Sequence, residues 1–154
     1  MNTESVSAKM TDQTARVADY TYVLNCNLRI LVVDDDPIQR EFASVYLATP
    51  SVEVVTARGG SEALAKLEKE SFDIALIDFD MPGMNGVELI TLLRAIPRFA
   101  ALPVIMVTGF EDIMTIDSAF HAGATTFVTK PVNWRLLSYQ IRFVLKHLKT
   151  PVAA

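Results

Sequence analysis

Five short apolar runs, separated by segments with helical periodicity, place the strongest constraint on the fold of this chain. They are LRILVV (28–33), VEVVTA (52–57), DIALID (73–78), PVIMVT (103–108) and TTFVT (125–129). Most of them lack alternating polar residues, which is typical of parallel strands that helices cover on both faces. Strands that alternate with helices along a chain predict an α/β fold, a doubly wound sheet of five parallel strands with five helices.

Capping and turn residues mark where the predicted helices begin and end. Proline, here Pro37, is favoured in the first turn of a helix. Glycine, here Gly123, is favoured directly after the last turn of a helix. Asn85, followed three residues later by Glu88, has the pattern of a capping box. We therefore expect helices that follow Pro37, start near Ser61, run from Asn85 to Pro97, span about 111–121 and start at Asn133.

Two of these helices carry apolar residues at helical spacing. The first places one set on a single face: Ile38, Phe42, Val45 and Tyr46. The fourth offers a second set: Ile113, Met114, Ile116 and Phe120. Such stripes usually face the core, so we expect most of the second set to be buried. Ile113 or Met114 on the surface would instead indicate a partner.

Length and composition favour one globular domain. The 154 residues are 51% hydrophobic and 21% charged, and the net charge is −4 without a run of Lys or Arg. That balance argues against a primary nucleic-acid or membrane-surface binder. Cys26 is the single cysteine, so no internal disulfide is possible, which fits a reducing cytoplasm. No apolar run approaches the roughly 18 residues of a transmembrane helix.

The domain boundaries follow from where the periodicity starts and stops. Residues 1–26 are polar and without sustained period, and we interpret them as a flexible N-terminal extension. Residues 27–149 form the predicted domain. Residues 150–154 are interpreted as a C-terminal tail or the stub of a linker.

Polar residues follow four of the five predicted strands. They are Asp34-Asp35-Asp36, then Asp78 and Asp80, then Thr108, then Lys130. Ligands of doubly wound sheets bind beyond the carboxyl ends of the strands, so these side chains should share one rim. Each alone has an ordinary explanation, such as a helix cap, a solvated turn or a β-forming threonine.

Together these residues point to phosphoryl transfer. Clustered carboxylates repel each other unless a cation joins them, and hard oxygen ligands favour Mg²⁺. A metal and a lysine neutralise phosphoryl oxygens, and a hydroxyl donates to one of them. An aspartate can be the nucleophile that becomes an aspartyl phosphate.

The segments ILVVDDDP, ALIDFDMPGMNG, VIMVTG and FVTKP occur in the order seen in the receiver domains of two-component response regulators. Over residues 28–148 the chain closely resembles that family, including the chemotaxis response regulators. The resemblance implies a flavodoxin-like three-layer sandwich with strand order 2-1-3-4-5. It also implies a phosphoacceptor that works with Mg²⁺.

The resemblance implies a role for each matching residue. Asp78 would accept the phosphoryl group, and Lys130 would pair first with Asp78 and then with that group. Asp34, Asp35 and Asp78 would hold Mg²⁺, together with the backbone carbonyl of Asp80. Asp36 aligns with a position that varies in the family, so we do not count it as a metal ligand. The peptide bond between Lys130 and Pro131 is expected to be cis.

The resemblance also implies a conformational switch. The Thr108 hydroxyl would turn towards the phosphoryl group, and the aromatic ring of Phe127 would follow into the space it leaves. The family more often has Tyr at that position, so Phe127 keeps the packing change without the hydroxyl. The face made by the helix over 111–121, the strand over 125–129 and the helix from Asn133 would then change shape.

The implied partners are those of a signalling protein. A sensor histidine kinase or a histidine phosphotransfer protein would supply the phosphoryl group. The switching face would bind a downstream protein or fused output domain, or form a homodimer, without direct nucleic-acid or membrane contact. The family implies a bacterial cytoplasmic protein that catalyses only its own phosphorylation and dephosphorylation. The segment PVNWRLLSYQIRFVLKHL (131–148) resembles receivers joined to larger outputs, including cyclic-dinucleotide enzymes.

Two alternatives stay open at this point. Haloacid-dehalogenase-like phosphatases also have a strand that ends in Asp-x-Asp, although their motif normally continues into Gly-Thr and opens the first strand. A flavodoxin-like FMN protein would share the fold, but the first strand–helix loop here is acidic and makes no phosphate cradle. We further hypothesise that the Asp80 side chain modulates how long the phosphoryl group survives.

Overall fold

A central parallel sheet organises the part of the chain that the computed structural model describes, residues 22–109 and 112–148. Its strands are β1 (Leu28–Val33), β2 (Val52–Ala57), β3 (Ile74–Asp78), β4 (Val104–Thr108) and β5 (Thr126–Thr129). They pair in parallel in the order β2-β1-β3-β4-β5. The predicted doubly wound sheet and its strand order are confirmed.

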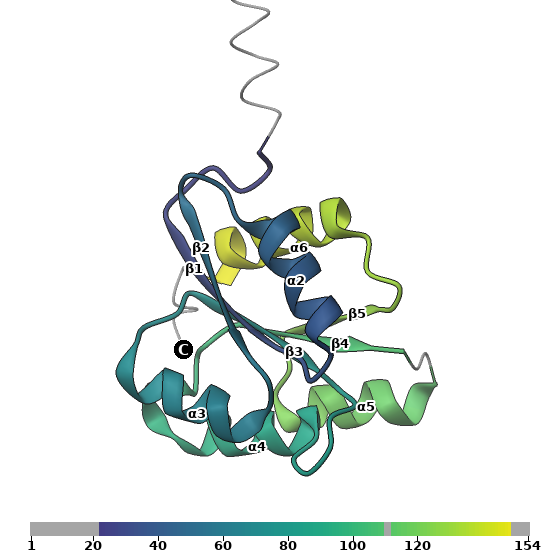
Figure 1. Ribbon diagram of the computed structural model, residues 1–154. Coiled ribbons are helices and arrows are strands. Elements are labelled where there is room, and N and C mark those ends of the chain that lie inside the picture. The colour runs from purple at the N-terminus through teal and green to yellow at the C-terminus, as the bar shows by residue number, and fades with distance from the viewer. Residues whose placement is uncertain (1–21, 110–111, 149–154) are drawn as a thin grey trace, which may run out of the picture.

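Helices cover both faces of the sheet, as Figure 1 shows. They are α2 (Pro37–Leu47), α3 (Gly60–Lys69), α4 (Gly86–Ala95), α5 (Ile113–Ala122) and α6 (Trp134–Leu148), with a short 3-10 helix at Pro97–Phe99. One buried cluster joins α3, α4 and α5 to the sheet, and a second joins α2 and α6 to the opposite face. Neighbouring strand residues alternate between the two clusters: Leu31 packs in the first, and Ile30 and Val32 pack in the second. This explains why the strands are continuously apolar.

Side-chain caps fix the starts of several helices near the strand ends. The Asn85 Oδ1 accepts a 2.9 Å hydrogen bond from the Glu88 N–H, as the capping pattern predicts. The Asn133 Oδ1 accepts one of 3.0 Å from the Leu136 N–H at the start of α6. Each cap satisfies one of the N–H groups that a helix leaves without an internal partner.

The structure corrects the predicted burial on α5 and shows which side of α2 faces the core. The set Ile38, Phe42, Val45 and Tyr46 on α2 is exposed, and the buried side of that helix is Ala43 and Leu47. On α5 the expected burial is wrong for Ile113, Met114 and Phe120, and the buried residue is Ala119. On α2 one alanine and one leucine pack in the core, and on α5 one alanine does, so most of the other large apolar side chains of both helices lie on the surface.

Two buried side chains precede the predicted domain boundary at residue 27. Val23 and Leu24 are buried, and Leu24 packs with Leu28 in the α2–α6 cluster. Residues 1–21 of the predicted extension and the predicted tail over 150–154 lie outside the described residues. Over 22–109 and 112–148, no helix is long and apolar enough to span a bilayer.

Gly123 is expected to be essential for the stability of the α5–β5 connection. Its φ is 110°, and a Cβ there would lie 2.7 Å from the Arg94 Cγ, whose Nε donates to the Gly123 carbonyl at 2.9 Å. Gly123→Ala should lower the free energy of unfolding by about 1–3 kcal/mol, measured by urea denaturation. Gly109→Ala is the control, because no atom lies within 4 Å of its Cβ position and its φ is not positive. A loss no larger than that of the control would contradict the account.

Candidate functional site

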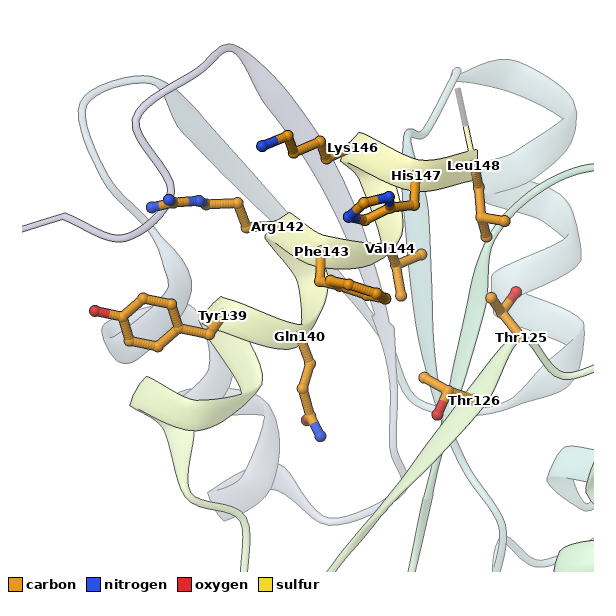
Figure 2. Close-up of a pocket in the computed structure, with 10 residues that line it drawn as sticks. All are labelled: Thr125, Thr126, Tyr139, Gln140, Arg142, Phe143, Val144, Lys146, His147 and Leu148. Carbon is orange, nitrogen blue, oxygen red and sulfur yellow. The ribbon is translucent and has the colours of Figure 1, made fainter. Parts of the chain in front are cut away.

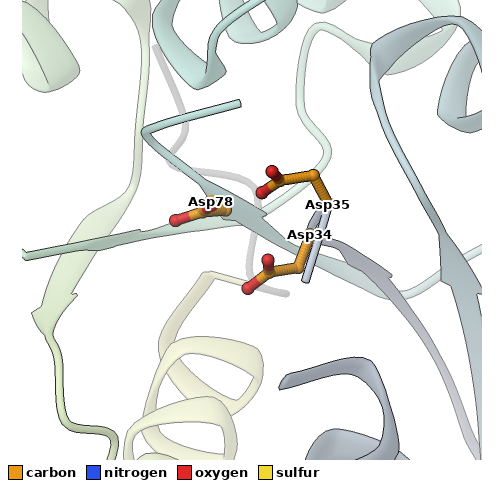
Figure 3. A group of neighbouring side chains, drawn as sticks. All are labelled: Asp34, Asp35 and Asp78. Atoms are coloured by element: carbon orange, nitrogen blue, oxygen red, sulfur yellow. The ribbon is translucent and has the colours of Figure 1, made fainter. Parts of the chain in front are cut away.

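Three carboxylates gather at the carboxyl edge of the sheet. Asp34 and Asp35 follow β1, and Asp78 is the last residue of β3, its neighbour in the sheet. One oxygen from each of the three lies within 4.8 Å of the others (Figure 3). The sheet therefore brings together the acids that the sequence predicted to meet.

Lys130 joins this cluster from the end of β5. Its Nζ lies 2.9 Å from the Asp78 Oδ1 and 3.8 Å from the Asp34 Oδ2. The Lys130 backbone N–H donates to the Thr108 carbonyl at 2.8 Å, so the lysine is fixed to the end of β4. The bond from Lys130 to Pro131 is cis, as expected.

Burial makes these carboxylates hard to ionise. The Asp78 side chain is only 2% exposed to solvent. Burial, together with the neighbouring charge of Asp34, raises the pKa of Asp78 to about 6 even though Lys130 lowers it. Burial likewise raises the pKa of Asp34. Although burial lowers the pKa of Lys130, the hydrogen bond to Asp78 and the nearby carboxylates raise it, so the ammonium stays charged.

The loop after β1 holds Asp34 in place. Its Oδ1 accepts a 2.9 Å hydrogen bond from the Asp36 N–H, and its carbonyl accepts one of 2.8 Å from the Arg40 Nη1. The Asp36 Oδ1 caps α2 by accepting from the Ile38 N–H at 2.9 Å. Asp36 therefore works as a helix cap, while Asp34 and Asp35 face Asp78.

Gly86 allows the site to pack against α4, and the sequence interpretation missed it. A Cβ at Gly86 would lie 2.5 Å from the Asp78 carbonyl oxygen and 3.0 Å from the Phe79 Cα. The start of α4 thus touches the backbone that carries Asp78. The signal was the glycine directly after the Asn85 cap, where a helix start meets the end of a strand.

The remaining predicted residues lie around the cluster. Thr108 ends β4 and is 2% exposed, whereas the Asp80 side chain is exposed and lies outside the carboxylate cluster. Phe127 is half-buried on β5, and its ring packs edge-on against Phe120 of α5 with 6.0 Å between centroids. The hydroxyl and the aromatic ring are thus on neighbouring strands.

The residues present fit a magnesium ion. Three carboxylates supply hard oxygen ligands on one rim, and two of them are buried with raised pKa values. Lys130 is a single positive charge against three acids. A divalent cation would balance the remaining negative charge, and Mg²⁺ keeps several waters while it binds few carboxylates.

Comparison with known proteins agrees with this geometry. The family model for the response regulator receiver domain matches residues 30–142 of the chain. The chain belongs to the response regulator receiver family. This match gives no support to the haloacid-dehalogenase-like alternative.

Individual relatives of this receiver domain are found among signalling proteins. It is 36% identical to the heme response regulator HssR of Staphylococcus aureus over 119 residues, which cover 77% of this chain and 52% of that protein. It is 33% identical over 120 residues to a cyclic di-GMP phosphodiesterase of Thermotoga maritima, covering 78% of this chain and 32% of that protein. The chain therefore spans about half or less of these relatives.

Solved receiver structures share the fold along almost their whole length. A CheY-like receiver domain protein from Methanospirillum hungatei is 34% identical with a TM-score of 0.74, covering 80% of this chain and 97% of that one. The chemotaxis protein CheY4 of Vibrio cholerae is 32% identical with a TM-score of 0.73, covering 77% and 99%. The flavodoxin-like class expected from the sequence is thus confirmed.

Neutralising Asp78 should stabilise the metal-free receiver domain at neutral pH. A raised carboxyl pKa means that ionisation opposes folding: the cost is absent below the unfolded pKa of about 4 and complete above the folded pKa. Asp78→Asn should therefore raise the free energy of unfolding by about 1–3 kcal/mol at pH 7 in EDTA, and by less as the pH falls towards 4. Urea denaturation across that range measures the gain.

Glu68→Gln is the matched control, because it removes an exposed carboxylate from α3. We expect it to change the free energy of unfolding by less than about 0.5 kcal/mol at each pH. An Asp78→Asn variant that is less stable than the wild type at pH 7, or equally stabilised at pH 4, would refute the assigned cost of burial.

Proposed function

We propose that Asp78 accepts a phosphoryl group from a phosphohistidine of a sensor histidine kinase or histidine phosphotransfer protein. The observation that carries this proposal is the buried Asp78 carboxylate at the end of β3. It lies 2.9 Å from the Lys130 Nζ and beside two further acids, Asp34 and Asp35. An Asp78 oxygen attacks phosphorus, the P–N bond to the histidine breaks, and the imidazole leaves with the bond's electron pair. The product is an aspartyl phosphate.

The neighbouring residues bind and neutralise the transferred group. Asp34, Asp35, Asp78 and the Asp80 carbonyl would hold Mg²⁺, which when bound neutralises phosphoryl oxygens. Lys130 already lies beside the acceptor oxygen and would pair with the same group after transfer. The burial of Asp78 and Thr108 at the ends of β3 and β4 strengthens these charge interactions.

Phosphorylation would switch the face made by α5, β5 and α6. The Thr108 hydroxyl, at the end of β4, would turn to a phosphoryl oxygen, and Phe127 would follow it inward. The edge-on contact between Phe127 and Phe120 supports a path from that movement to α5. Ile113 and Met114, 75% and 80% exposed, would lie on the face that reads it.

The exposed apolar face of α2 fits the docking of the phosphodonor. This helix starts directly after Asp36 in the chain, and its exposed large side chains are apolar or aromatic: Ile38, Phe42, Val45 and Tyr46. Apolar patches of this kind on a surface indicate a protein partner. Tyr46 stacks on Trp134 of α6 with 6.1 Å between ring centroids, which extends the patch.

In the proposed role, the protein is a cytoplasmic signalling component and not a metabolic enzyme. It catalyses only its own phosphorylation and dephosphorylation. Its output goes through a downstream protein, a homodimer at the α5–β5–α6 face or an attached output domain. The greater length of relatives such as HssR supports an attached output.

Incubation with acetyl phosphate and Mg²⁺ tests the acceptor directly. We expect the intact mass of the wild type to rise by one phosphoryl group, and the mass of Asp78→Asn to stay unchanged. EDTA should abolish the gain, because it removes the Mg²⁺ that would neutralise the phosphoryl oxygens beside the acids. No gain on the wild type under conditions that preserve acyl phosphates would overturn the proposal. Multiple-turnover hydrolysis of a phosphomonoester would favour a phosphatase instead.

Asp80 is proposed to set the lifetime of the phosphoryl group. Its exposed carboxylate, two residues from the acceptor, can orient or repel the water that hydrolyses an aspartyl phosphate. Asp80→Asn should change the lifetime several-fold, followed as loss of phosphoryl mass after acetyl phosphate is removed. Glu88→Gln on α4 is the control with the same change of charge, and a lifetime equal to that of this control would refute the role.

A further inference from the structure

A groove runs between the outer edge of β5 and helix α6, away from the carboxylate cluster. Its wider part has a volume of about 760 Å³ and includes Thr125 and Thr126 from the strand side and Tyr139, Gln140 and Phe143 from the helix. A second hollow of about 290 Å³ lies along Phe127, Val128 and Thr129, and Gln140 lines both. Figure 2 shows the helix and the strand side by side around the wider part. We propose that this groove binds an extended acidic peptide segment that adds to β5.

The free edge of β5 supplies the first reason. β5 is the last strand in the sheet order, and no strand pairs with its outer side in the described chain. An edge strand presents unpaired N–H and C=O groups, which an extended peptide satisfies by adding a further strand. The strand is only four residues long, Thr126–Thr129, so a short segment is enough to cover it.

Gln140 supplies a second and independent reason. Its Oε1 is buried and has no hydrogen-bond partner among the described residues. In Figure 2 the Gln140 side chain extends from α6 towards the strand side of the groove. A buried acceptor without a donor costs about 1–3 kcal/mol, and an N–H of a bound peptide would satisfy it.

The charge of the groove selects the kind of peptide. Of the residues that line its wider part, Arg142 and Lys146 are cationic and none is acidic. The whole of α6 carries three cations, Arg135, Arg142 and Lys146, and no Asp or Glu, although the chain has a net charge of −4. In Figure 2 both cationic side chains extend to the side of α6 away from Thr125 and Thr126, so an acidic peptide complements the helix side of the rim. Phe143, 63% exposed, offers an apolar contact for alternate side chains of the same peptide.

The peptide would bind on the α5–β5–α6 face. The proposal rests on the proposed function only in one respect, namely that this face is the surface that binds downstream partners. The groove itself does not require phosphorylation. Binding is therefore measured on the wild type with and without acetyl phosphate, and on Asp78→Asn. A wild type that binds the peptide but gains no phosphoryl group from acetyl phosphate would refute the proposed function alone.

The probe is a blocked peptide of about nine residues in which Glu alternates with Val around a central Phe. We expect its binding to shift the backbone amides of 126–129 and the Gln140 side-chain amide in ¹⁵N spectra. Gln140→Leu removes the acceptor while it keeps the packing and should weaken binding about three- to tenfold. Lys146→Glu should weaken it several-fold, more at low salt.

Matched controls separate the groove from general charge attraction. Lys69→Glu makes the same change of charge on α3, on the other face of the sheet, and should leave the affinity nearly unchanged. A peptide N-methylated on its strand-pairing amides and a peptide with Lys in place of Glu should both bind much more weakly. The proposal is overturned if the acidic peptide shifts no groove amide at millimolar concentration, or if Lys69→Glu weakens it as much as Lys146→Glu. It is also overturned if sedimentation shows a dimer at this edge that the peptide does not displace.

Discussion

The buried carboxylate of Asp78 at the end of a central strand is the constraint on which the rest of the site depends. A charge that is 2% exposed must be compensated, and Lys130 at 2.9 Å supplies only part of that compensation. Burial outweighs that compensation and raises the pKa of Asp78 to about 6. Asp34 and Asp35 add further negative charge, so the same site that is unfavourable when empty suits a divalent cation and a phosphoryl group.

The parallel sheet makes this arrangement rigid. Its strands carry apolar residues on both faces, so each strand end is fixed by two buried clusters at once. Four neighbouring strands, β1, β3, β4 and β5, then bring the polar residues at or just beyond their ends to one rim, and the loops need only short turns to finish it. The close contact of Gly86 with the Asp78 carbonyl shows how little space is left behind the acceptor. Rigidity of this kind favours a site that positions charge before the reaction begins.

Much of the fold and of the site could be predicted from the sequence, because both depend on local patterns. The continuous apolar runs required a sheet covered on both faces, and the residue after each run fixed what reaches the rim. Caps such as Asn85 depend on a single side chain and were equally readable. The buried face of α5 was not readable in this way, because that helix has apolar residues on more than one side and only the folded chain shows that Ala119 is the one that packs in the core. The Phe127–Phe120 contact joins residues from different elements, so only the folded chain could show it, whereas the glycine directly after the Asn85 cap was a sequence signal for the close packing at Gly86.

The titration of the Asp78 carboxyl carbon, followed by ¹³C NMR, tests this account most directly. The account predicts a pKa of about 6 for Asp78 in EDTA, and a clearly lower pKa when Mg²⁺ is added and the cation stabilises the carboxylate. A pKa close to the ordinary value of about 3.9 in EDTA, with no change on adding Mg²⁺, would contradict it.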